Sequence, residues 1–266
     1  MRTAVVTGAA SGIGLALVRL LLREGWQVAA VVRDAMPEDA EFDLAKRAAV
    51  LREYRCDLSN AESRRKALVQ LVAGEPTVHA LFNNAGVSTA TLKFSPQARE
   101  LHYEVNCIAP YVLMHGLADN LARGAGIVIN TASDALFFDR RYTPEKLSNP
   151  DPFRIVFGPY ATSKLALALW GRAVAPSLAK QGVSIVSVSP GAIRTPLVKG
   201  PGFPWFLKPI ALIIAKSPAH GARALFLGLG NAFPSGSFVT KGRTAELPFE
   251  DKAMQTLDVV MTDALR

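Results

Sequence analysis

Short apolar runs alternate along this chain with longer stretches of helical period. The first run, TAVVTG at 3–8, is followed by SGIGLALVRLLLREG at 11–25, which ends at a glycine. The runs lack polar alternation, so both faces of the sheet they form should be covered by helices. This order of elements predicts an α/β fold with a doubly wound parallel sheet and helices on both faces.

The same pattern places the remaining elements. Further strands are expected in the runs 27–33, 50–58, 78–86, 126–133 and 183–191. Helices are expected at 60–74, in a long stretch ending near Arg123, and after Gly158. No repeat or linker precedes an irregular segment at 196–218. We therefore interpret residues 1–266 as one domain.

The two cysteines, Cys56 and Cys107, lie far apart and have no metal-ligand spacing. This argues against a disulfide scaffold or a metal site and favours a reducing compartment, which we expect to be the cytoplasm. The chain starts directly in a strand, so no signal peptide is expected. The longest apolar stretch, at 203–215, contains Lys208 and Pro209 and is too short to span a bilayer.

The formal net charge is +8. Such a charge suits nucleic acid, a membrane surface or an anionic ligand. The basic residues are scattered, however, and the densest cluster is Arg64, Arg65 and Lys66 on an expected helix. We expect a solvated basic surface and no nucleic-acid partner, while weak contact with a membrane surface stays open.

The segment TGAASGIG places Gly8, Gly12 and Gly14 between the first strand and the first helix. Glycines here allow a tight turn and a close backbone approach to a pyrophosphate at the start of the helix. The spacing Gly-x-x-x-Gly-x-Gly differs from the usual dinucleotide pattern, and a plain turn is the alternative. Its place after a strand that opens the chain favours a dinucleotide site.

The end of the second strand bears on which dinucleotide is bound. An NAD site commonly has an acidic residue there to hold the ribose 2′-hydroxyl, whereas this chain has Val32 and Arg33. Arg33 suits a 2′-phosphate through charge-assisted hydrogen bonds. Asp34 follows at once, and Arg33 also fits a plain surface charge. The residues favour NADP, with NAD possible.

A phenol and an ammonium stand together in GPYATSKLALALW at 158–170, because Tyr160 and Lys164 are neighbours on a helix. Ionising a free tyrosine at pH 7 costs about 4 kcal/mol. A lysine at about 5 Å would return roughly 3 kcal/mol at an effective dielectric constant near 20. The pair therefore suits general acid–base chemistry. The alternative is an amphipathic helix start with a snorkelling lysine.

Six motifs in this order make the chain resemble the short-chain dehydrogenase/reductase family. They are TGAASGIG, NNAG at 83–86, Asn106, Ser133, YATSK at 160–164 and PGAIRT at 190–195. The resemblance covers nearly the whole chain and implies a Rossmann-type fold and an enzyme that transfers a hydride between a nicotinamide and a carbonyl or alcohol. It also implies a homo-oligomer that acts on small molecules.

The resemblance assigns catalysis to Asn106, Ser133, Tyr160 and Lys164. Tyr160 would exchange a proton with the substrate oxygen and Ser133 would hydrogen-bond that oxygen. Lys164 would acidify the phenol and bind the nicotinamide ribose, and Asn106 would hold Lys164 through water in a proton relay. From the residues alone, Ser133 also fits a turn cap and Asn106 a solvent-facing position.

The resemblance also implies the cofactor contacts. Asp57 would meet the adenine, Asn83 and Gly86 would shape the cofactor-side wall, and the segment 190–195 would meet the nicotinamide end. The expected cofactor-binding residues are Gly8, Ser11, Gly12, Ile13, Gly14, Arg33, Asp57, Leu58, Asn83, Ala85, Gly86, Tyr160, Lys164, Pro190, Gly191, Ile193 and Thr195. The four histidines, His79, His102, His115 and His220, show no ligand spacing, and we assign them no chemistry.

The long gap between Ser133 and Tyr160, and the helix start SPAHGA at 217–222, resemble the retinol-dehydrogenase-like branch. Two segments beside the site are rich in aromatic residues, namely Phe137, Phe138, Tyr142, Phe153 and Phe157 in the gap, and Phe203, Trp205 and Phe206 in an expected substrate lid at 196–218. They favour a lipophilic or aromatic substrate. Packing on the domain, on a partner subunit or on a membrane surface is the alternative. A non-catalytic dinucleotide-sensing protein on the same fold also stays open.

Overall fold

The computed structural model describes residues 1–150, 154–155, 158–194, 215–230 and 233–266. Its strands are β1 (Thr3–Thr7), β2 (Gln27–Val32), β3 (Leu51–Arg55), β4 (Ala80–Asn83), β5 (Ile127–Thr131), β6 (Ser184–Ser189), β7 (Phe238–Thr240) and β8 (Arg243–Ala245). Its α-helices are α1 (Gly12–Arg23), α2 (Ala40–Arg47), α3 (Ala61–Gly74), α4 (Leu101–Tyr103), α5 (Ala109–Gly116), α6 (Ala118–Arg123), α7 (Pro159–Ala179), α10 (Pro218–Leu227) and α11 (Ala253–Ala264).

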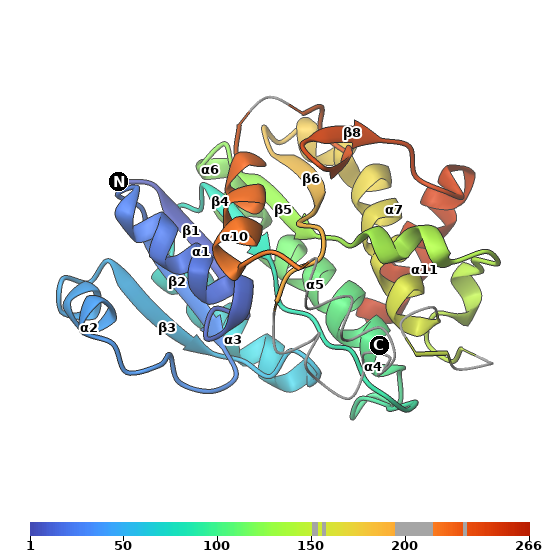
Figure 1. Ribbon diagram of the computed structural model, residues 1–266, viewed down its shortest axis with the longest axis horizontal. Helices are drawn as coiled ribbons and strands as arrows, with labels where there is room; N and C mark the ends of the chain where they lie inside the picture. The colour runs from blue at the N-terminus through green and yellow to red at the C-terminus, as the bar shows by residue number, and fades with distance from the viewer. Residues whose placement is uncertain (151–153, 156–157, 195–214, 231–232) are drawn as a thin grey trace.

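The strands form an eight-stranded sheet in the order β3-β2-β1-β4-β5-β6-β7-β8 (Figure 1). Neighbours run parallel from β3 through β7, and β8 pairs antiparallel with β7 at the edge. The order reverses between β1 and β4, where doubly wound sheets open a crevice at the carboxyl ends of their strands. The predicted doubly wound α/β fold is confirmed.

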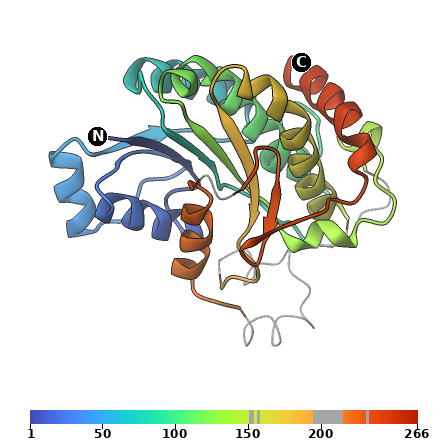
Figure 2. The ribbon, with the colours of Figure 1, turned by 90° about the horizontal axis from the view of Figure 1, so that it is seen from above.

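The sheet is covered on both faces, as the unbroken apolar runs predict (Figure 2). All five residues of β1 are buried. One core lies between the sheet and the α1–α2–α10 layer, and contains Leu17, Phe42 and Leu225. The other lies beneath α3, α5, α7 and α11, and contains Leu71, Trp170 and Leu257. The sheet therefore has a hydrophobic core on each of its two faces, as the α/β pattern of the sequence predicts.

The structure adds elements that periodicity did not indicate. Helix α2 lies between β2 and β3, where no helix was expected, and β7, β8 and α11 follow the last predicted strand. The long helical stretch before Arg123 is divided into α4, a π-helical turn at Glu104–Ile108, α5 and α6. Of the expected lid at 196–218, only 215–218 belongs to the described residues.

The expectations about membranes and metals can be compared only with the described part of the chain. Within it, no helix combines the length and apolar character needed to cross a bilayer. The same residues contain no group of three or more His, Cys, Asp and Glu side chains placed to hold a metal ion. Cys56 and Cys107 are both buried free thiols.

Candidate active site

Asn106 lies at the centre of the π-helical turn and is fully buried. Its Oδ1 accepts the N–H of Val87 at 2.8 Å, while its Nδ2 donates to the Val87 carbonyl at 3.1 Å and to Oγ of Ser163 at 3.1 Å. Pro110 has no N–H, so it cannot make the bond that an α-helix would place on the Asn106 carbonyl. Single π-helical turns of this kind are frequent at functional sites. The solvent-facing alternative for Asn106 is therefore wrong.

Tyr160 and Lys164 lie in the first turns of α7, which begins at Pro159. Lys164 is buried, and its Nζ donates to the Thr131 carbonyl at 2.7 Å. Burial lowers the pKa of Lys164 to about 8. Burial raises the pKa of Tyr160, and a side-chain hydrogen bond with Ser133 acts in the opposite direction. The spacing predicts a phenol of lowered pKa, whereas in the structure burial decides the direction and the pKa of Tyr160 is raised.

Ser133 has two roles in the structure. Its Oγ accepts the Ala135 N–H at 3.2 Å and so caps the 3₁₀ turn Asp134–Phe138, as the alternative interpretation held. The same side chain lies close enough to Tyr160 to oppose the rise in the pKa of its phenol. The turn therefore holds the serine hydroxyl against the phenol at the carboxyl end of β5.

Gly86 connects the loop after β4 to this group. A Cβ atom added to Gly86 would lie 3.3 Å from Oδ1 of Asn106 and 3.5 Å from Nζ of Lys164. The loop therefore approaches both side chains closely, and residue 86 is itself exposed. The buried side chains of Asn106 and Lys164 thus meet beneath Gly86. Tyr160 precedes Lys164 by one turn of α7, and Ser133 follows β5.

The glycine loop fits a dinucleotide pyrophosphate. Gly8 and Gly12 have φ of +66° and +55°, which favours glycine at both positions. A Cβ on Gly14 would overlap the carbonyl oxygen of Gly8, so α1 packs directly on the loop. Within the described chain, the exposed Ser11 makes no side-chain cap and the first turn of α1 has no acidic residue. The N–H groups of that turn suit a phosphate.

Two residues that the sequence analysis did not single out hold this loop. Oγ1 of Thr7 accepts the N–H groups of Asn84 and Ala85, each at 3.0 Å, and donates to the Phe82 carbonyl at 3.3 Å. Nδ2 of Asn84 donates to the Thr7 carbonyl at 2.9 Å. Thr7 and Asn84 therefore join the ends of β1 and β4. Their place inside TGAASGIG and NNAG was the available signal.

Asn83 differs from its expected place at the cofactor-side wall. Its side chain is buried, and its Nδ2 donates to Oδ1 of Asn130 at 2.9 Å and to the Pro110 carbonyl at 3.4 Å. It links β4 to β5 and to the start of α5. Its neighbours Ala85 and Gly86 are less buried than Asn83.

The adenosine-side residues lie at the ends of β2 and β3. Arg33 is exposed and pairs with Asp34 at 3.2 Å, so the two residues that compete in the sequence also meet in space. Asp57 is exposed, and its Oδ1 accepts the N–H of Ser59 at 2.9 Å and its hydroxyl at 2.7 Å. Leu58 is buried and its side chain packs in the core.

The residues expected at the nicotinamide end follow β6. Pro190 is partly buried, and Gly191 has a φ of +77° and is exposed. Ile193 is buried. A Cβ atom added to Gly221 of α10 would lie 3.2 Å from the Ile193 side chain and 3.0 Å from that of Ile13. Helix α10 therefore packs against the start of α1 and against the segment after β6. Thr195 lies outside the described residues.

Comparison with known proteins gives this arrangement a family. A family model described as short chain dehydrogenase matches residues 2–143. Protein FixR of Bradyrhizobium diazoefficiens is 30% identical over 92% of this chain and 84% of its own length. Retinol dehydrogenase 12 of Bos taurus is 31% identical over 74% of this chain and 63% of its own length.

The chain belongs to the short-chain dehydrogenase/reductase family. It is an oxidoreductase of the retinol-dehydrogenase-like branch, as the motifs predict.

Solved structures of other short-chain dehydrogenases and reductases share the fold. The 3-alpha-hydroxysteroid dehydrogenase of Pseudomonas sp. B-0831, complexed with NADH, has a TM-score of 0.70 at 24% identity over 89% of this chain and 94% of that one. NADPH-bound carbonyl reductase from chicken fatty liver has a TM-score of 0.67 at 23% identity over 92% and 98%.

The aromatic residues between Ser133 and Tyr160 divide into two groups. Tyr142 is buried, and its hydroxyl lies 2.9 Å from Oγ1 of Thr256 in α11, so it packs on the domain and not on a substrate. Phe137 and Phe138 are 39% and 54% exposed. Phe153, Phe157, Phe203, Trp205 and Phe206 lie outside the described residues. Phe137 also packs edge-to-face on Phe238 of β7, with ring centroids 5.8 Å apart.

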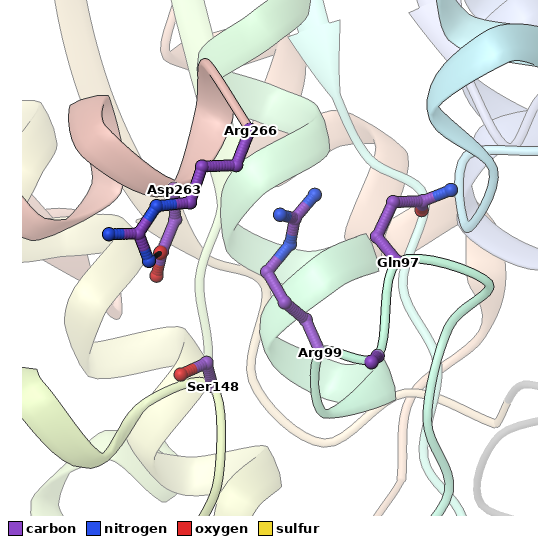
Figure 3. Close-up of a pocket in the computed structure, with 6 residues that line it drawn as sticks. Gln97, Arg99, Ser148, Asp263 and Arg266 are labelled. Atoms are coloured by element: carbon purple, nitrogen blue, oxygen red, sulfur yellow. Dashed lines mark ion pairs between the residues drawn. The ribbon is translucent and has the colours of Figure 1, made fainter.

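A cavity of about 320 Å³ lies elsewhere in this short-chain dehydrogenase/reductase (Figure 3). Its lining is polar and is formed by Gln97, Ala98, Arg99, Ser148, Asp263 and Arg266. The Arg99 side chain projects between Gln97 and the two residues from the end of the chain. None of the predicted site residues borders this cavity, so we do not assign it to the reaction.

Proposed function

We propose that this short-chain dehydrogenase/reductase is an NADP(H)-dependent enzyme for a lipophilic or aromatic carbonyl or alcohol. The observation that carries the proposal is a group of side chains at the carboxyl edge of the sheet, where Asn106 and Lys164 approach Gly86 after β4 and Ser133 acts on Tyr160 after β5. The glycine loop with the start of α1 would hold the pyrophosphate at the same edge. Gly86 leaves room for the nicotinamide end beside Lys164.

The side chains support proton transfer at one substrate oxygen. When bound, the nicotinamide supplies or accepts the hydride. Tyr160 gives the substrate oxygen a proton during reduction and takes it during oxidation, and Ser133 holds that oxygen by a hydrogen bond. Lys164 contacts the ribose and presents an ammonium next to the phenol. Asn106 positions the loop at Val87 and the α7 residue Ser163.

The substrate class is tested with a homologous series. Purified protein with NADPH is assayed against straight-chain aldehydes of rising length and against aryl ketones. We expect kcat/KM to rise with each added carbon, by at most about 0.8 kcal/mol per buried CH₂. A flat or falling series rejects the lipophilic pocket. Absence of turnover with every carbonyl supports the alternative of a dinucleotide-sensing protein on the same fold.

The cofactor preference rests on Arg33. The side chains of Arg33 and Asp34 are 75% and 78% exposed, so their ion pair contributes little to stability. The guanidinium can therefore turn toward a 2′-phosphate. We expect NADPH to bind more tightly than NADH. Arg33→Ala should remove most of the difference, because a charge-assisted bond contributes about 1.5–3 kcal/mol, or roughly ten- to a hundredfold.

The measurement is a fluorescence titration of both cofactors into the wild type and the variant. Arg55→Ala is the matched control, because Arg55 is also exposed and ends the neighbouring strand β3. It should leave the preference unchanged. Equal affinities for NADPH and NADH in the wild type would assign the ribose contact to Asp34 and make the enzyme NAD-dependent.

We further propose that residues 1–266 form one domain and that the protein is a cytoplasmic homo-oligomer. The continuous sheet and the two joined core layers support the first statement. Light scattering of the purified protein measures the oligomeric state. Co-sedimentation with anionic vesicles at two salt concentrations tests the alternative of membrane-surface contact.

A further inference from the structure

His102 is a buried histidine with a defined hydrogen-bonding pattern. It is 1% exposed, its Nδ1 lies 2.6 Å from Oε1 of Glu100, and its Nε2 accepts the Thr89 N–H at 3.0 Å. A backbone N–H can only donate, so Nε2 carries no proton in this arrangement. The ring proton then sits on Nδ1 and faces the carboxylate, which fixes both the tautomer and the ring orientation.

Glu100 holds this ring from a rigid position. Its carboxylate is fully buried, and its second oxygen accepts the Tyr103 N–H at 2.9 Å, which caps α4. Its own N–H donates to the Ser148 carbonyl at 2.8 Å. The residue therefore ties the start of the helix to the segment between Ser133 and Tyr160, and His102 is oriented by the frame of the site.

His102 and Asn106 lie one helical turn apart and hold the same loop. Asn106 binds Val87 through both backbone groups, and His102 binds the N–H of Thr89 two residues later. The loop that contains Gly86 is thus fixed at two points by neighbouring side chains.

The same ring meets the phenol of Tyr160. The ring centroids of His102 and Tyr160 are 6.2 Å apart with an interplanar angle of 79°, an edge-to-face contact. Such contacts prefer one mutual orientation. The Tyr160 side chain must present its hydroxyl to a substrate oxygen in one orientation. This matters because a displacement of about 1 Å at a reacting group can reduce the rate a hundredfold.

We propose that His102 is a positioning residue for Tyr160: it holds the phenol ring by edge-to-face contact and fixes the loop 86–89 through Thr89. The proposal rests on the proposed function, in which Tyr160 exchanges a proton with the substrate. His102 itself does not touch the substrate oxygen. Its removal should lower kcat by about tenfold to a hundredfold while the NADPH dissociation constant changes by less than about twofold.

A measurement on the wild type tests the geometry without any variant. ¹⁵N NMR of histidine-labelled protein reports the tautomer of each ring. We expect His102 to be the Nδ1–H tautomer and the Thr89 amide to be protected from hydrogen exchange. A proton on Nε2, or an unprotected Thr89 amide, overturns the proposal.

Two variants remove the ring contact with Tyr160 and the hydrogen bond with Thr89 one at a time. His102→Gln can still accept from Thr89 but has no ring, and His102→Phe keeps a ring but loses both hydrogen bonds. His115→Gln is the matched control, because His115 is exposed on α5. With 4-nitrobenzaldehyde and NADPH, we expect both His102 variants to lose kcat and the control to match the wild type. A fall in melting temperature with unchanged kcat per folded enzyme overturns the proposal and leaves His102 a structural residue.

A second readout does not depend on turnover. The protein has five tyrosines, so ¹³Cζ-tyrosine labelling with Tyr160→Phe as the assignment variant identifies the Tyr160 signal. We expect that signal to shift in His102→Gln and to stay in place in His115→Gln. An unchanged Tyr160 signal in His102→Gln overturns the proposal. If the wild type reduces no carbonyl, the proposed function fails, and this spectrum still decides whether His102 orients Tyr160.

Discussion

Replacing Tyr160 with Phe is expected to lower kcat by about a hundredfold to ten-thousandfold, the range of general acid–base catalysis. The substitution removes one hydroxyl and leaves the ring in contact with His102. NADPH affinity should stay within about twofold of the wild type, because the hydroxyl acts on the substrate oxygen. Steady-state assays and a fluorescence titration measure the two quantities.

The control for this substitution is Tyr111→Phe. Tyr111 lies on α5 and packs against Trp170 with ring centroids 5.6 Å apart, on the α7 side of the core. Removal of its hydroxyl should leave kcat unchanged. Turnover near the wild-type value in Tyr160→Phe would contradict the catalytic assignment, whichever substrate is used.

Replacing Lys164 with Met is expected to reduce activity and raise stability together. Loss of the ribose contact should weaken NADPH binding by roughly tenfold to a hundredfold, as a charge-assisted hydrogen bond of about 1.5–3 kcal/mol would. Turnover should fall with it, because Lys164 supports Tyr160. The free energy of unfolding at neutral pH should rise, since a buried ammonium is replaced by a side chain of similar length.

The pH dependence of the free energy of unfolding tests whether the buried Lys164 ammonium lowers stability. The pKa of Lys164 is about 8 in the folded chain, below its ordinary value of 10.5, so between these pH values the unfolded state binds more protons. The free energy of unfolding of the wild type should therefore gain up to about 3 kcal/mol from Lys164 as pH rises through this window. Below pH 8 the cost of the buried charge is fully present.

Urea unfolding of the wild type and Lys164→Met across this pH range gives the difference that belongs to Lys164. It should be largest near neutral pH and shrink toward pH 10.5. A constant difference would mean that Lys164 keeps its ordinary pKa in the fold. Unchanged NADPH affinity in the variant would remove the ribose contact from the proposed function.

The fold was predictable because its signals are local. Runs such as TAVVT are buried in full, and helix α1 stops where Gly25 ends its period. The short strands β7 and β8 were missed, since each has only three residues and β8 has no buried residue. Helix α2 has a polar composition that hides its buried Phe42. Short or polar elements depend on tertiary contacts, which periodicity does not record.

The site was predictable where a motif names the residue and less so where burial decides. Asn106, Ser133, Tyr160 and Lys164 lie at neighbouring points, as the order of motifs implies. The spacing of Tyr160 and Lys164 predicts an acidified phenol, whereas the depth of the site raises its pKa. His102 stands four positions before Asn106, and nothing in that spacing shows that Thr89 and Glu100 would enclose the histidine.

A parallel β-bridge between Ile193 and Lys216 lies at the base of the segment that we expect to form the substrate lid. The backbone N–H of Arg194 donates to the Lys216 carbonyl at 2.9 Å, and the backbone N–H of Lys216 donates to the Ala192 carbonyl at 2.9 Å. These bonds join the two chain segments that flank residues 195–214. Once the ends of a chain segment are fixed, doubling its length adds only about 0.6 kcal/mol of closure entropy. Exchange of residues 195–214 for the equivalent segment of a relative should therefore leave the sheet intact, so the role that we propose for this segment as a substrate lid can be tested without rebuilding the fold.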